Sequence, residues 1–201
     1  MNNSPRVLAL CTGSVKPILI RNAGRPGDID QVMSGIHKSV VSQEHDPQTI
    51  TCQRMGLVGD EQADLNVHGG LDKAIYCYPF EHYAFWKKAF PWLAEQASLY
   101  GQVGENLCTE GLVEADVYVG DQLRIGQEVL LRITKPREPC YKFNAKMRSP
   151  SAAKLMAQEG RCGWYASVLQ EGKIKAGDPI AVIPGPRDIT VAAEYQRLMR
   201  R

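Results

Sequence analysis

The feature that most constrains the fold of this chain is a stretch of alternating apolar and polar residues across 122–133. Apolar side chains stand at positions 123, 125, 129, 131 and 133, and Gly126–Glu128 interrupts the alternation. A period of two places these side chains on one face of a β-strand, and a short break that contains glycine predicts a turn. The sequence therefore predicts an antiparallel hairpin with one buried face.

Further short apolar stretches recur along the chain, with turn residues between them. They predict strands over Val7–Cys11, Ile36–Ser42, Ile50–Leu57, Ala74–Tyr78 and Ile180–Ile183. Ala74–Tyr78 is continuously apolar, which is typical of a strand buried on both faces.

Helices are expected in three places, near 80–90, 150–159 and 190–200. Pro79 and Pro91 delimit the first helix, whereas Ser149 as N-cap and Gly160 delimit the second. Because strands outnumber helices, the sequence predicts a mainly β fold, an antiparallel β-barrel-like body with a few peripheral α-helices.

The composition and charge exclude several classes of protein. Of 201 residues, 44% are apolar and 23% are charged, as in an ordinary soluble domain. The formal charge of +2 excludes a strongly basic nucleic-acid-binding protein. Met1–Pro17 lacks the apolar core and cleavage site of a signal peptide, and no run approaches the ~18 apolar residues that span a membrane. We expect a cytoplasmic protein with one main domain and no membrane contact, in which Arg21–Asp30 is a surface loop between the first two strands.

Six cysteines stand at positions 11, 52, 77, 108, 140 and 162. No pair has the spacing of a structural zinc site, and a chain of this length does not need disulfides for stability. Most of these thiols, Cys77 among them, are predicted to be small buried hydrophobes.

The most unusual segment is Pro136–Lys142, in which two prolines bracket Arg137 and Glu138 and Cys140 follows the second. Proline restricts its own backbone and that of the preceding residue, so a stiff, extended connector is predicted after a strand. Arg137 and Lys142 are close enough in sequence to stabilise a thiolate on Cys140. The alternative is that Cys140 is a buried structural thiol.

A second segment, Val67–Ile75, contains residues suited to ligand binding. In Val67–Ile75, the pair Gly69–Gly70 lets the backbone approach a ligand, and His68 and Lys73 flank it with polar groups. The alternative is a plain turn before a buried strand.

Acidic and amide residues form the third candidate. Asp60, Glu61, Glu105 and Asn106 can form a metal or acid–base cluster, or serve as capping and turn residues. His82 is interpreted as a surface or packing histidine.

Six motifs in a fixed order closely resemble the MOSC family, and within it the YiiM-like group. The motifs are GLVGDEQAD (56–64), VHGGLDKA (67–74), YPFEHYAFW (78–86), GENL (104–107), PREPCYK (136–142) and GWYASV (163–168). The resemblance extends from Ser34 to Pro184 and implies a MOSC β-barrel domain over 1–185. It implies that 186–201 is a C-terminal helix, with which a three-helix domain begins in similar chains. Cys162 departs from the family pattern and is interpreted as incidental.

The resemblance implies a molybdenum cofactor, in which molybdopterin holds molybdenum through its dithiolene and the family cysteine, Cys140, is the protein ligand. A soft thiolate suits such a metal. The residues in the matching motifs that would surround the cofactor are Lys38, His68, Gly69, Gly70, Lys73, Glu105, Asn106 and Arg137.

The activity that the resemblance implies is reduction of N-hydroxylated compounds, such as hydroxylaminopurines, to the amine and water. The sequence has no flavin, nicotinamide or iron–sulfur motif, so electrons would come from a separate flavoprotein or ferredoxin-like reductase. One alternative is a sulfurtransferase that carries a persulfide on Cys140. Another is a non-catalytic cofactor-binding module. Pyridoxal phosphate occurs in parts of the superfamily, but nothing here marks a Schiff-base lysine. Oligomeric state, including a homodimer, stays open.

Overall fold

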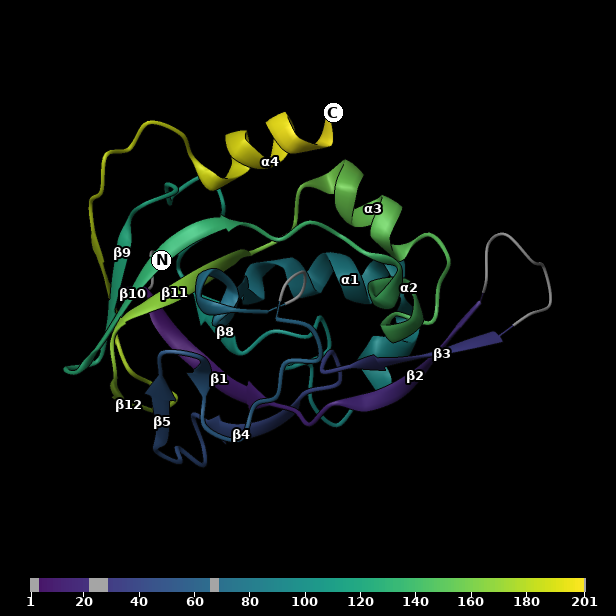
Figure 1. The fold of residues 1–201 in the computed structure, drawn as a ribbon, viewed down its shortest axis with the longest axis horizontal. Helices are drawn as coiled ribbons and strands as arrows, with labels where there is room; N and C mark the ends of the chain where they lie inside the picture. The colour runs from purple at the N-terminus through teal and green to yellow at the C-terminus, as the bar shows by residue number, and fades with distance from the viewer. Residues whose placement is uncertain (1–3, 22–28, 66–68, 201) are drawn as a thin grey trace.

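The computed structural model describes residues 4–21, 29–65 and 69–200, and its main element is an eight-stranded sheet that curls into a half-barrel (Figure 1). The order of its strands is β13 (Ile180–Ile183), β9 (Gln122–Ile125), β10 (Val129–Pro136), β11 (Trp164–Gln170), β7 (Ile75–Pro79), β8 (Leu107–Glu110), β1 (Arg6–Thr12) and β4 (Ser39–Gln43). All neighbours are antiparallel except β7 and β8, which are parallel. The predicted mainly β fold is confirmed.

Smaller elements complete the fold. A three-stranded sheet contains β12 (Gly172–Ile174), β5 (Ile50–Gln53) and β6 (Gly56–Leu57), and a hairpin contains β2 (Lys16–Arg21) and β3 (Ile29–Ser34). The α-helices are α1 (Tyr83–Ala89), α2 (Tyr141–Lys146), α3 (Ala152–Glu159) and α4 (Val191–Met199). The 3₁₀ helices are η1 (Leu71–Lys73), η2 (Phe80–His82) and η3 (Pro91–Glu95). In the described part of the chain, every helix is too short or too polar to traverse a lipid bilayer.

The curled sheet separates two hydrophobic clusters, and β7 contributes to both. Ile75 and Cys77 pack into the first cluster, with the apolar residues of β9 and β10. Tyr76 and Tyr78 point the other way, into a cluster formed with side chains of all four α-helices. Successive side chains of a strand alternate between faces, so a strand between two cores is buried throughout, as predicted for this segment.

The predicted hairpin is also confirmed, since Leu131 of β10 pairs with Leu123 of β9 and both are buried. The strand predicted over 36–42 begins only at Ser39, and the one over 50–57 is a hairpin of β5 and β6. The second predicted helix is α3, which begins at Ala152, so its N-cap residue is Ser151 rather than Ser149.

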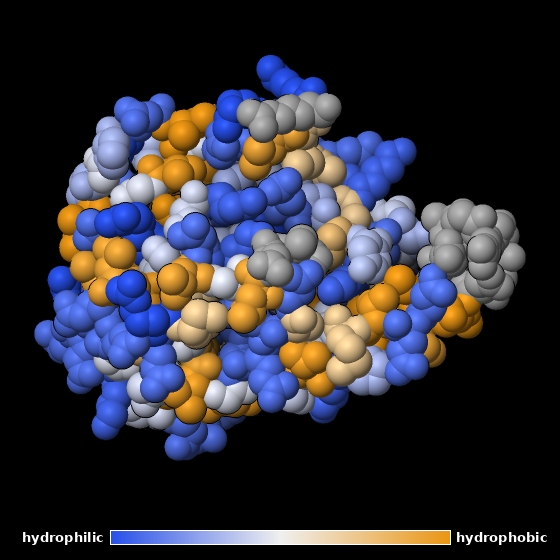
Figure 2. Space-filling view, viewed as in Figure 1, coloured by the Kyte–Doolittle hydropathy of each residue, from blue (hydrophilic) through white to orange (hydrophobic). Residues whose placement is uncertain are grey.

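The interpretation of Arg21–Asp30 as a surface loop was wrong at both ends of the segment. Arg21 is the last residue of β2, and Ile29 and Asp30 begin β3; the residues between them lie outside the described part of the chain. The hairpin presents Leu19, Ile29 and Met33 to solvent, and Figure 2 shows hydrophobic surface in this region. Its other face contacts α2, which shields Ile18.

Candidate functional site

A pocket of about 690 Å³, including its open mouth, lies where loops from both halves of the chain meet. Its wall is built from the end of β3 and the following loop, the loop after β6, η1, β7, the turn before β8, the connector after β10, and β11. Its polar, charged and aromatic lining includes Lys38, Asp60, Gln62, Lys73, Tyr76, Asn106, Arg137, Cys140, Lys142 and Tyr165.

Cys140 lies on the pocket wall, in extended backbone directly before α2. All six cysteines are described and none forms a disulfide; Cys140 is partly exposed, and the other five are fully buried. Burial raises the pKa of those five thiols, to about 12 for Cys52. They therefore stay protonated at neutral pH, and Cys140 is the thiol that a ligand or reagent can reach.

This difference in exposure predicts selective labelling. We expect iodoacetamide to alkylate Cys140 alone in the native protein and all six thiols after unfolding, because reaction requires access to the sulfur. Peptide mapping by mass spectrometry measures the site and stoichiometry. As the control, native Cys140→Ser protein should take up no label. Labelling of a second peptide at a similar rate would contradict the assignment.

Arg137 is 4% exposed, and its guanidinium lies 4.8 Å from the ring centroids of both Tyr76 and Phe143. Its Nη1 donates to the Tyr76 hydroxyl at 3.2 Å and to the Val103 carbonyl at 3.1 Å. Burial alone would lower the pKa of Arg137, but the neighbouring Tyr76 and Tyr165 outweigh it and raise the pKa. Among the described residues, no carboxylate forms an ion pair with this group. It is a buried cation held by neutral partners.

Lys38 and Asn106 reach the pocket through a shared carboxylate. The Nζ of Lys38 lies 2.5 Å from Oδ1 of Asp60, which also accepts the Gly13 amide proton at 2.8 Å. The Nδ2 of Asn106 donates to Oδ2 of Asp60 at 2.8 Å, and Oδ1 of Asn106 accepts from the Tyr76 backbone N–H. The charge of Lys38 is therefore largely neutralised, and Asn106 has a fixed orientation.

Two further lysines line the pocket. Lys142 is 8% exposed, and its Nζ donates to the Met33 carbonyl at 3.3 Å. Lys73 extends from η1, with its Nζ 5.9 Å from the ring centroid of Tyr165. Burial and then the charge of Lys135 lower the pKa of Lys73. With Arg137, these lysines make this side of the pocket suited to an anion.

The glycine pair at 69–70 does not line the pocket. Gly70 has φ of +87° and donates its N–H to Oε1 of Gln62, which does line it, at 2.8 Å. A Cβ at Gly69 would lie 2.2 Å from the same side-chain oxygen. The pair therefore supports the wall through Gln62. His68, predicted beside it, lies outside the described residues.

Glu105 was expected to line the pocket, and the structure instead buries it completely. Its carboxylate accepts hydrogen bonds from the Tyr83 hydroxyl at 2.5 Å, the Gly101 amide at 2.7 Å and the Val103 amide at 3.1 Å. Because these donors already occupy both of its oxygens, its role is to order the turn before β8.

The acidic metal cluster is not supported either. Within the described ranges, no group of three or more His, Cys, Asp and Glu side chains is arranged to hold a metal ion. Asp60 and Glu61 accept backbone N–H groups of Gly13 and Val15, which is the turn-stabilising alternative.

Sequence reasoning missed Tyr76 and Tyr165 as pocket residues. The available signal was the alternation along β7, which places Tyr76 on the face opposite Ile75 and Cys77. The pairing of Tyr165 with Tyr76 across β11 and β7 had no sequence signal. His82 is buried and bonded to Glu114 at 2.7 Å, so the packing interpretation of this histidine holds rather than the surface one.

Comparison with known proteins places the chain in a family. The model of the MOSC domain matches residues 64–181. Protein YiiM of Escherichia coli is 45% identical over 139 residues, which are 68% of this chain and 60% of that protein. A protein named "Reductase" from Gibberella moniliformis is 34% identical over 188 residues, covering 88% of this chain and 33% of that protein.

Solved structures agree with this result. The crystal structure of YiiM from Geobacillus stearothermophilus superimposes with a TM-score of 0.73 at 26% identity, covering 97% of this chain and 84% of that one. The chain spans about three fifths of the length of the E. coli relative and a third of the Gibberella one. The chain therefore belongs to the MOSC domain family.

Proposed function

We propose that the protein binds a molybdenum cofactor in this pocket, with Cys140 as the protein ligand to the metal. The observation that carries the proposal is the place of Cys140, a partly exposed thiol on the wall of a pocket that also contains buried cations. Thiolate sulfur is a soft ligand suited to a thiophilic metal. Membership of the MOSC family supports the association with this cofactor.

The residues present fit such a group. Since the described residues provide no cluster of metal-binding side chains, most ligands of a metal next to Cys140 would come from a non-protein group, as a dithiolene provides. Arg137 and Lys142 are nearly buried cations whose hydrogen-bond partners are uncharged. Buried charges favour a counter-ion. A terminal phosphate would supply it.

Each pocket residue then has a role in holding the cofactor. Cys140 ligates the metal, and Arg137 and Lys142 bind anionic oxygens. Lys73 adds a third positive group, and Lys38 contributes hydrogen bonds while Asp60 balances its charge. The remaining predicted contacts would come from Asn106 directly and from Gly69 and Gly70 through the position of Gln62.

When bound, the cofactor supplies two-electron chemistry that removes oxygen from an N-hydroxylated compound. The overall reaction consumes two electrons and two protons and yields an amine and water. The electrons would come from a separate flavoprotein or ferredoxin-like reductase. The Gibberella relative named "Reductase" supports redox activity.

The test is to produce the protein in a host that makes the cofactor, then measure metal content, pterin fluorescence and reduction of a hydroxylaminopurine by an artificial electron donor. We expect about one molybdenum and one pterin per chain, with amine formation that depends on both. Protein from a host deficient in cofactor synthesis is the control. Tight cofactor binding with no turnover would indicate a binding module instead.

The partly exposed thiol favours a second candidate equally, a sulfur carrier with a persulfide on Cys140. This candidate predicts sulfane sulfur that cyanide releases, and an adduct of about 32 Da, the mass of one sulfur atom, on the peptide that contains Cys140. Metal-free protein with this adduct and without reductase activity would favour it over the reductase.

A further inference from the structure

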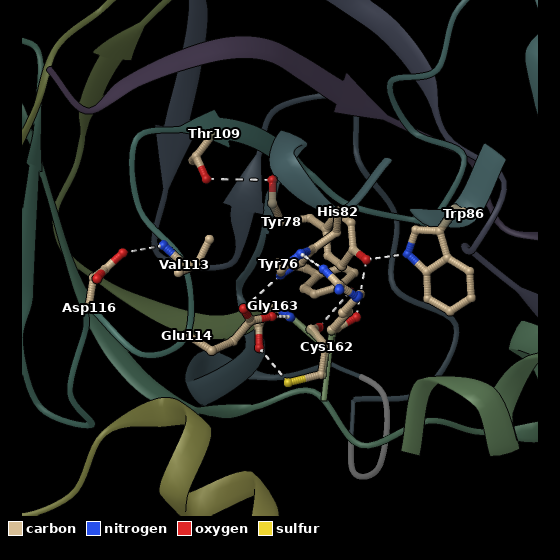
Figure 3. Close-up of polar contacts among 11 residues, drawn as sticks. Tyr76, Tyr78, His82, Trp86, Thr109, Val113, Glu114, Asp116, Cys162 and Gly163 are labelled. Carbon is tan, nitrogen blue, oxygen red and sulfur yellow. Dashed lines mark hydrogen bonds and ion pairs between the residues drawn. The ribbon is translucent and has the colours of Figure 1, made fainter. Parts of the chain in front are cut away.

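The segment Arg161–Gly163, between α3 and β11, is held by side chains from elsewhere in the chain; Figure 3 shows Cys162 and Gly163 beside Tyr76, Tyr78 and Glu114. The Tyr78 hydroxyl donates to the Arg161 carbonyl at 3.1 Å, and the Tyr76 hydroxyl donates to the Cys162 carbonyl at 2.8 Å. The Gly163 carbonyl accepts the Arg137 backbone N–H at 3.4 Å. The backbone of this segment therefore contacts two residues of the pocket wall.

One peptide group of the segment forms a hydrogen bond on each side. Its carbonyl, that of Cys162, accepts from Tyr76, and its N–H, that of Gly163, donates to Oε1 of Glu114 at 2.6 Å. Tyr76 in turn accepts from Nη1 of Arg137. A continuous chain of hydrogen bonds thus connects the buried carboxylate of Glu114 to the buried guanidinium of Arg137.

The direction of every bond in this chain follows from chemistry. An arginine only donates, so the Tyr76 oxygen is the acceptor and its single proton goes to the Cys162 carbonyl. All donors consequently point from Arg137 towards Glu114, from the positive end to the negative end. Bonds aligned in this way polarise and strengthen one another in a low-dielectric interior.

Glu114 is itself fixed as an acceptor at both oxygens. Arg161 Nη1 lies 3.2 Å from Nδ1 of His82, so Nδ1 accepts and Nε2 carries the proton, which it donates to Oε2 of Glu114 at 2.7 Å. Burial alone would raise the pKa of Glu114, but the hydrogen bonds from His82 and Gly163 outweigh it and hold the pKa below its ordinary value. The carboxylate is therefore ionised at neutral pH.

We propose that Glu114 is a positioning residue for the pocket: through the Cys162–Gly163 peptide and the Tyr76 hydroxyl, it holds the guanidinium of Arg137 in place. Glu114 is not among the residues that line the pocket, so it acts on Arg137 through intervening groups. Tyr76, although it lines the pocket, directs its proton away from it and is a positioning residue as well. These hydrogen bonds form without any ligand in the pocket. Only their predicted effect on cofactor retention rests on the proposed function.

The test measures hydrogen exchange of the Arg137 guanidinium protons by NMR, in metal-free protein, with the signals assigned by their loss in Arg137→Lys. Tyr76→Phe keeps the ring and removes the hydroxyl. Glu114→Gln places an amide NH₂ against one of two donors, Gly163 N–H or His82 Nε2–H, whichever way the amide is turned. We expect each variant to accelerate the exchange about ten-fold, the equivalent of one net hydrogen bond.

The double variant Tyr76→Phe/Glu114→Gln separates positioning from general destabilisation. If both residues act through one chain, its exchange should be no faster than that of the faster single variant. The control is Asp121→Asn. It changes a fully buried carboxylate that accepts the backbone N–H groups of Tyr118 and Gly185 and does not belong to the hydrogen bonds between Glu114 and Arg137. The Asp121→Asn variant should have a lower free energy of unfolding. Its Arg137 guanidinium protons should exchange at the wild-type rate under conditions where every variant is folded.

Multiplicative effects in the double variant, or exchange in Glu114→Gln equal to that in Asp121→Asn, would overturn the proposal. If Glu114→Gln does not fold, unchanged exchange in Tyr76→Phe overturns it alone. A separate readout, the half-time of pterin release from cofactor-loaded protein, should shorten in the same variants. Faster exchange with unchanged pterin release would refute the cofactor contact of Arg137 and leave its positioning by Glu114 intact.

Discussion

Replacing Cys140 with serine is expected to remove molybdenum from the purified protein and to reduce reductase activity to near background. The substitution exchanges a soft anionic ligand for a hard neutral one, which a thiophilic metal binds poorly. Folding should change little, because Cys140 is partly exposed and the cost of a buried hydroxyl, about 1–3 kcal/mol, is an upper limit here. Metal content, activity and the free energy of unfolding are measured on the same preparations.

The controls are the serine substitutions of the five buried cysteines, at 11, 52, 77, 108 and 162. Protein that remains folded should retain its metal and activity, because none of these thiols lines the pocket. Full reduction of an N-hydroxylated base by metal-loaded Cys140→Ser protein would contradict the assignment of Cys140 as the metal ligand.

Gly163→Ala is expected to cause a large loss of stability. Gly163 is buried with φ of +65°, and a Cβ there would lie 2.4 Å from the Cys77 carbonyl oxygen and 2.9 Å from the Tyr78 ring. The carbonyl belongs to the central strand β7, which cannot move away. We expect the free energy of unfolding to fall by more than about 3 kcal/mol, measured by urea denaturation.

Gly177→Ala is the matched control. Gly177 also has a positive φ, +88°, but no atom lies within 4 Å of a Cβ placed there. This variant should lose only the cost of the backbone conformation, about 1 kcal/mol. Equal losses in the two variants would show that the contact with β7 is not the cause.

The sequence by itself determined the elements whose patterns are local. Alternation over 123–133 predicted the β9–β10 hairpin, and the continuous apolar run at 74–78 predicted a strand with both faces buried. The two prolines around Arg137 and Glu138 predicted a stiff, extended connector after a strand, and residues 137–140 connect the end of β10 to α2. These predictions succeed because period, turn residues and proline act over a few neighbouring residues.

Local pattern was insufficient where pairing decides the structure. Within Arg21–Asp30, glycine and proline indicated a loop, although Arg21, the last residue of β2, pairs with Ile29, the first residue of β3. The short helix α2 directly after Cys140 was missed for the same reason, since its burial of Phe143 and not its own sequence stabilises it.

Only the tertiary structure decided which polar residues face the pocket. Glu105 and Asn106 are adjacent in a single motif, yet Glu105 is enclosed by donors of its own turn while Asn106 reaches Asp60 from 46 residues away. Arg137 finds its hydroxyl partner 61 residues away, on Tyr76, and that hydroxyl is held by a peptide that Glu114 fixes. Hydrogen bonds and desolvation depend on distances between side chains, and those distances exist only after strands far apart in the sequence have paired.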